Sequence, residues 1–174
     1  MDGRILGRSR TSPSREANSQ DCTARWHRYV AAEQEYVAVR RALLNTDLSV
    51  VRASLQGRGP AGARGFRAAV HLLDALPMTW IEANLDVLLR LSIEGGTEWF
   101  MIRPLLDRVE AGRLDAGLGA LVADITTAQP PSAEDFGGLV GLLRELGRPD
   151  LLRAVLDRAR ESSDPNVREI ADDD

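Results

Sequence analysis

The chain has 174 residues, of which 44% are hydrophobic and only 5% aromatic. This composition predicts one domain with a core of Leu, Val and Ala, as packed helices have. All 22 basic residues are Arg, so chemistry that requires a Lys nucleophile or Schiff base is excluded. The net charge is −4, and because an acidic body repels phosphate backbones, nucleic acid is disfavoured as a partner.

The first twenty residues differ from the remainder. They are rich in Arg, Ser and Gly and carry a net charge of +2, whereas residues 21–174 hold 18 Arg against 24 acidic residues, a net charge of −6. We therefore expect a disordered tail over 1–20 and a single helical domain over 21–174. The alternative for the tail is an Arg-bearing peptide that folds onto a partner.

The composition also indicates a compartment. No apolar segment is long enough for a signal peptide or a membrane span, and the lone Cys22 cannot form an internal disulfide. We expect a cytoplasmic protein with no membrane partner.

Helical periodicity begins at Thr23. One predicted helix runs from there to about residue 44, and a second, capped by Asp47, ends at Gly57. A third extends from about Ala61 to Pro77. The first helix carries apolar residues at spacings of three, four and seven: Trp26, Tyr29, Val30, Tyr36, Val37, Leu43 and Leu44.

A fourth predicted helix should be the central one. Thr79 and Glu82 have the spacing of a capping box at its start, and Gly95-Gly96 ends it. Because it is apolar around most of its circumference, we expect neighbours on several sides. Leu85, Leu88 and Leu89 should be among the most buried residues.

The remaining predicted helices are shorter. They cover about 97–109, with Pro104 as a kink or as the true beginning, then 114–125, then 132–146 with Ser132 as N-cap, and then 149–160 after the tight turn "LGRPD". No segment has the alternation of a strand. The predicted fold class is therefore all-α, with about eight to nine helices stacked as antiparallel pairs.

The C-terminal stretch "LLRAVLDRARESSDPNVREIA" favours a repeat. Asp164 and Pro165 are a favoured N-cap and first helical residue, and "LLRLSIEGGTEWFMIRPLLDR" and "LLRELGRPDLLRAVLDR" echo each other. The stretch resembles a HEAT repeat, in which an Asp-Pro pair precedes a helix that opens with Val-Arg, here Val167-Arg168. The resemblance implies a short HEAT-like α-solenoid, and the last segment would be either a final unit that caps the stack or the start of further repeats.

No constellation predicts catalysis or cofactor binding. "GRGPAG" at 57–62 has the spacing of a dinucleotide fingerprint but follows a predicted helix, whereas the fingerprint requires a preceding strand. His27 and His71 have no second His or Cys at ligand spacing. We expect no enzyme activity, no cofactor and no metal.

The stretch "EWFMI" offers candidate partner-binding residues. Trp99 and Ile102 fit a core stripe, so Phe100 or Met101 must point elsewhere; packing against a neighbouring helix is the alternative to binding a partner. The four residues expected to bind a partner are Trp80, Trp99, Phe100 and Arg103.

The sequence leaves two candidate functions for the chain. The first is a module that binds or inhibits another protein, in an immunity-like, antitoxin-like or adaptor role. The alternative comes from the resemblance, because HEAT-like folds include nucleic-acid-binding proteins and DNA glycosylases. In such a groove Trp80, Trp99 and Arg103 would face a damaged base.

Overall fold

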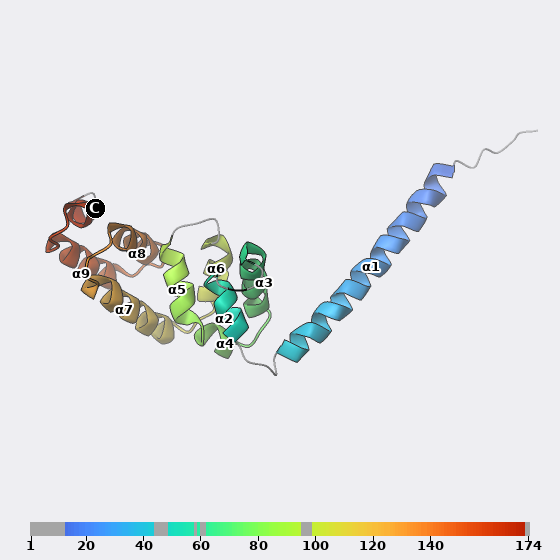
Figure 1. The fold of residues 1–174 in the computed structure, drawn as a ribbon, viewed down its shortest axis with the longest axis horizontal. Coiled ribbons are helices and arrows are strands. Elements are labelled where there is room, and N and C mark those ends of the chain that lie inside the picture. The colour runs from blue at the N-terminus through green and yellow to red at the C-terminus, as the bar shows by residue number, and fades with distance from the viewer. Residues whose placement is uncertain (1–12, 44–48, 58, 60–61, 95–98, 173–174) are drawn as a thin grey trace, which may run out of the picture. The chain divides into compact units, whose positions relative to one another are not determined.

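The computed structural model describes residues 13–43, 49–57, 59, 62–94 and 99–172, and all regular structure in these ranges is helical (Figure 1). Ten helices are present there, one or two more than expected. The expected cap at Asp47, the helix end at Gly95-Gly96 and half of the glycine-rich stretch 57–62 lie outside the described residues. None of the described helices is long and apolar enough to cross a membrane.

The chain divides into two compact units, Met1–Asp47 and Leu48–Asp174. The first contains one long helix, α1 (Pro13–Leu43), which therefore includes part of the stretch expected as a tail. Proline is favoured at the first position of a helix, and Glu16, Ala17 and Gln20 are good helix formers. The composition that suggested disorder is thus compatible with helix after residue 12.

The second unit contains the nine other described helices. They are α2 (Ser49–Leu55), α3 (Gly62–Asp74), α4 (Met78–Glu82), α5 (Leu85–Ile93), α6 (Trp99–Leu106), α7 (Ala111–Thr127), α8 (Ala133–Glu145), α9 (Pro149–Arg160) and α10 (Pro165–Asp172).

Packing in the second unit follows a regular order. The helices α2, α5, α7 and α9 form a continuous row, in which each packs against the next. Each of the four also packs against the helix that follows it in the chain, namely α3, α6, α8 and α10 respectively. The short α4 packs against α3.

The expected fourth helix is interrupted, which corrects the sequence prediction. It consists of α4 and α5, separated at Ala83-Asn84. The buried Asn84 leaves the helical region at ψ 12°, and its side-chain amide donates to the Trp80 carbonyl at 2.9 Å. An Asn side chain that bonds nearby backbone competes with helical hydrogen bonding, so the chain turns here. The expected capping box is also wrong, because α4 begins after Pro77 without a side-chain cap.

The second half of the predicted central helix, α5, lies in the core. Leu88 and Leu89 of α5 are fully buried and Leu85 is nearly so, and α5 packs against α2, α6, α7 and α8. A helix with neighbours on several sides needs apolar residues around most of its circumference. The expected burial of these three leucines is confirmed.

Two predicted helix starts are confirmed as well. The Ser132 hydroxyl accepts the Asp135 N–H at 3.2 Å, and the Asp164 carboxylate accepts the Asn166 N–H at 2.8 Å. Both satisfy a backbone donor that has no partner inside its helix. The cap at Asp164 allows α10 to place the fully buried Val167 against α8 and α9.

Candidate functional site

The first turn of α6 presents the most exposed aromatic side chain of the second unit. Phe100 is 69% exposed, whereas Ile102, two positions later, is fully buried. Residues two apart on a helix point in different directions, so one face of α6 enters the core and Phe100 faces outward. The alternative prediction, that Phe100 packs against a neighbouring helix, is therefore wrong.

Arg103 follows Phe100 by three residues and contacts several neighbouring groups. Its guanidinium lies 5.8 Å from the centre of the half-buried Trp99 ring, within the range of a cation–π contact. The Arg103 Nε donates to Asp107 at 2.9 Å, and its Nη1 donates to the Glu145 carbonyl at 3.4 Å and lies 3.7 Å from the Glu145 carboxylate. Arg103 thereby ties α6 to the last residue of α8. Arg103 on α6 is thus held from three directions.

The structure brings together three of the four candidate residues. Trp99, Phe100 and Arg103 share α6, and we call them the α6 patch. Trp80 lies on α4 and is half-buried, and among the described residues no ring or cation contact joins it to this patch.

A second surface feature is a pocket of about 600 Å³ between α5 and α7. Leucine side chains, Leu85, Leu89 and Leu121, form its apolar wall. Acidic residues predominate among its charged lining: Asp86, Glu94 and Asp124 against Arg90. The pocket combines an apolar wall with a charged rim, in which Asp86 and Asp124 form ion pairs with arginines.

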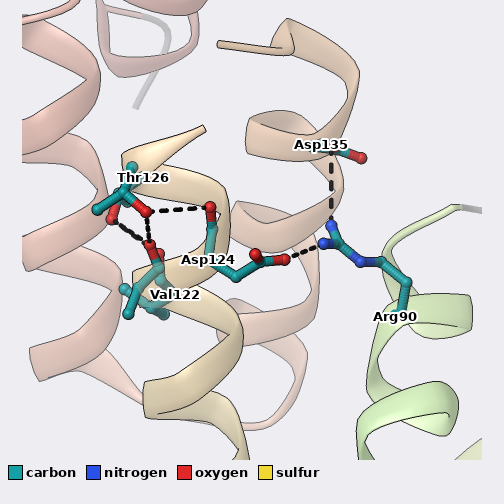
Figure 2. A network of polar contacts seen from close by, with 7 residues as sticks. Arg90, Val122, Asp124, Thr126 and Asp135 are labelled. Carbon is teal, nitrogen blue, oxygen red and sulfur yellow. Dashed lines mark hydrogen bonds and ion pairs between the residues drawn. The ribbon is translucent and has the colours of Figure 1, made fainter. Parts of the chain in front are cut away.

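Arg90 belongs to the lining of this pocket, and Figure 2 shows its polar contacts. Its guanidinium forms an ion pair with Asp124 of α7, and its Nη1 lies 3.8 Å from the Asp135 carboxylate of α8. Beside it, the Thr126 hydroxyl donates to the Val122 carbonyl at 2.8 Å in the last turn of α7. One arginine from α5 therefore joins three helices.

A similar pair joins α2 to α5. Arg52 donates through both terminal nitrogens to the Asp86 carboxylate, in one bond at 3.0 Å, and reaches the Ala83 carbonyl at 3.4 Å. The hydrogen bonds from Arg52, opposed by partial burial, lower the pKa of Asp86 below its usual value. Asp86 is therefore charged at neutral pH, and the paired Arg52 balances this charge.

These ion pairs are contacts at the candidate site that the sequence analysis missed. Arg52–Asp86 and Arg90–Asp124 each join an arginine to an aspartate 34 positions further along, and Arg148, the N-cap of α9, pairs with Asp115 of α7 at 2.6 Å. Each junction of the row α2, α5, α7, α9 is thus bridged by an Arg–Asp pair. The equal spacing of the first two pairs was the available signal.

No cluster of three or more His, Cys, Asp or Glu able to hold a metal occurs among the residues that the structure describes. Comparison with known protein families, characterised proteins and solved structures gives no significant match to the chain.

Proposed function

We propose that the chain is a protein-binding module built as a short HEAT-like α-solenoid, and that the α6 patch is its partner contact. The observation that carries the proposal is the exposure of Phe100 next to the fixed Trp99–Arg103 pair. Rigid aromatic side chains with a neighbouring Arg are the residues that dominate binding energy at protein interfaces.

The packing order supports the solenoid part of the proposal. A continuous row of helices, each with the following helix packed against it, is the arrangement that stacked helix pairs produce. In that arrangement α2/α3, α5/α6, α7/α8 and α9/α10 are antiparallel pairs, and α4 belongs to the connection between the first two.

A sequence repeat supports the same arrangement. The segments "VVRASL" (50–55) and "LLRLSI" (88–93) agree at three buried positions, Val51 with Leu89, Ser54 with Ser92 and Leu55 with Ile93. They differ at the first position, where Val50 is exposed and Leu88 is buried. The arginine of each segment pairs with an aspartate on the next helix of the row. Equivalent residues in equivalent environments are expected of successive repeats.

Charge favours a basic partner. The unit Leu48–Asp174 holds 14 Arg against 20 acidic residues, a net charge of −6. A negative surface attracts a positive one during encounter. An inhibitor or adaptor that covers a basic protein surface fits this distribution.

The nucleic-acid alternative has less support. Arginines that could contact phosphates are held by carboxylates: Arg52, Arg90, Arg103, Arg108 and Arg148 all form ion pairs with Asp or Glu. A phosphate contact would have to displace these partners. The absence of a gel shift at low salt and micromolar protein would remove this alternative.

Site-specific cross-linking in the cells that make the protein tests the proposal. Phe100 is replaced by a benzoylphenylalanine, and Val50 of α2, an exposed apolar residue (44%), carries the same probe as the control. We expect illumination to give one adduct of discrete mass from position 100, resistant to nuclease, and none from position 50. No adduct at position 100, or the same adducts from both positions, would contradict the proposal.

A binding variant then separates loss of contact from loss of fold. Because Phe100 is exposed, Phe100→Ala should change the free energy of unfolding by less than about 0.5 kcal/mol. It should nevertheless reduce recovery of the cross-linked partner in a pull-down at least about tenfold, as loss of a central aromatic contact does.

A further inference from the structure

The long helix α1 carries an aromatic and aliphatic stripe on one face. Trp26, Tyr29, Tyr36 and Val37 are exposed, Trp26 by 63%, and the Trp26 and Tyr29 rings stack with their centres 5.6 Å apart. Within the unit Met1–Asp47 the structure describes no other helix that could cover them. Since a helix in water gains most of its stability by packing its apolar face, we expect a partner helix to cover the stripe.

Two charged residues lie inside this stripe. Glu33 and Arg40 are seven residues apart, which is two helical turns and an axial distance of roughly 10 Å. The positions within α1 one turn away from either residue on the same face are uncharged: Tyr29, Val30, Tyr36, Val37 and Leu43. Neither charge has an opposite charge one turn away along the stripe.

We propose that α1 pairs with α1 of a second copy of this chain as an antiparallel coiled coil, with a two-fold axis that passes between Tyr36 and Val37. In this register Glu33 of one copy faces Arg40 of the other, and the symmetry forms this pair twice. A parallel register would instead place Glu33 against Glu33 and Arg40 against Arg40, which like-charge repulsion disfavours.

The apolar residues fit the same register. At the axis Tyr36 of one copy meets Val37 of the other, and Val30 meets Leu43 one turn beyond the charged pair. The contact spans residues 30–43 of each copy, roughly 20 Å of helix, so the stacked Trp26 and Tyr29 lie just outside it. Charged pairs at inward positions commonly specify the register and orientation of a coiled coil, so Glu33 and Arg40 select this pairing among the possible ones.

Sedimentation equilibrium of the full chain tests the pairing through charge reversal. The wild-type chain should be a dimer, and Glu33→Arg, which sets Arg against Arg, should raise the dimer dissociation constant at least about tenfold. Combining Glu33→Arg with Arg40→Glu should restore the dimer. The control is Glu35→Arg on the opposite face of α1, which changes the net charge equally and should leave the dissociation constant within about twofold.

The outcomes that overturn the proposal are distinct. A wild-type chain that stays monomeric over the whole concentration range would overturn it. A double variant whose dimer dissociation constant is no lower than that of Glu33→Arg would overturn it too. Equal effects of Glu33→Arg and Glu35→Arg would show that net charge alone matters.

The exposed Cys22 reports the orientation. A parallel pair would bring the two Cys22 residues together, whereas the antiparallel register holds them roughly 40 Å apart, far beyond the Cα separation of about 7 Å that a disulfide tolerates. Mild oxidation of the dimer should therefore give no disulfide-linked species. Efficient Cys22–Cys22 linkage would overturn the antiparallel arrangement.

Discussion

Gly138 of α8 lies so close to Ile93, the last residue of α5, that a Cβ atom at position 138 would be 2.0 Å from the Ile93 carbonyl oxygen. The obstructing atoms belong to backbone and cannot rotate away. Gly138→Ala must therefore push α8 from α5, and overpacking of this kind costs about 1 to 3 kcal/mol. Urea denaturation should show this loss in the free energy of unfolding.

Gly141 supplies the matched control on the same helix. A Cβ atom there would have no atom within 4 Å, and replacing a helical glycine by alanine removes flexibility from the unfolded chain. Gly141→Ala should raise the free energy of unfolding by up to about 1 kcal/mol. Equal effects at positions 138 and 141 would contradict the close approach of α5 and α8.

Leu88 tests the central position of α5. The side chain is fully buried, so Leu88→Ala leaves a cavity among the surrounding helices and should cost about 2 to 5 kcal/mol. The half-buried Leu91 on the same helix should lose less when changed to Ala. Guanidinium denaturation measures both, and a loss at position 88 below that at position 91 would be inconsistent with this core.

Local signals in the sequence predicted much of this fold. Ser132 and Asp164 are N-caps as expected because their side chains act on backbone within a few residues, and the three leucines of α5 are buried because periodicity follows from helix geometry. The break at Asn84 escaped prediction. The hydrogen bond from Asn84 to the Trp80 carbonyl competes with helix only once burial makes an unpaired amide costly, and burial is a tertiary property.

The candidate site shows the same division. Helical spacing predicts that four consecutive apolar residues cannot all face the core. Which of them is exposed, here Phe100, depends on the helices that α6 packs against. The equal spacing of 34 positions in Arg52–Asp86 and Arg90–Asp124 is visible in the sequence, but the pairing itself depends on which helices are adjacent.

The cap of α10 gives a prediction at the end of the second unit. The Asp164 carboxylate accepts the Asn166 N–H at 2.8 Å, so Asp164→Ala should lower the free energy of unfolding by about 0.5 to 2 kcal/mol. Asp164→Asn is the control, because asparagine caps helices equally well and should retain most of the stability. Thermal melting followed by circular dichroism distinguishes the two, and similar losses for both variants would argue that charge, not capping, is important here.

The pair between Arg52 and Asp86 predicts a pH dependence. Because Arg52 lowers the pKa of Asp86, the pair stabilises the fold above the usual aspartate pKa of about 3.9 and is lost as the pH falls through the lower folded value. Both side chains are partly exposed, so Asp86→Asn should cost only about 0.2 to 1 kcal/mol at neutral pH. The difference from wild type should shrink below about pH 4, while Arg52 remains charged throughout. In an Arg52→Gln background the same substitution should have almost no effect at any pH, and an undiminished loss there would mean that Asp86 stabilises the fold through another contact.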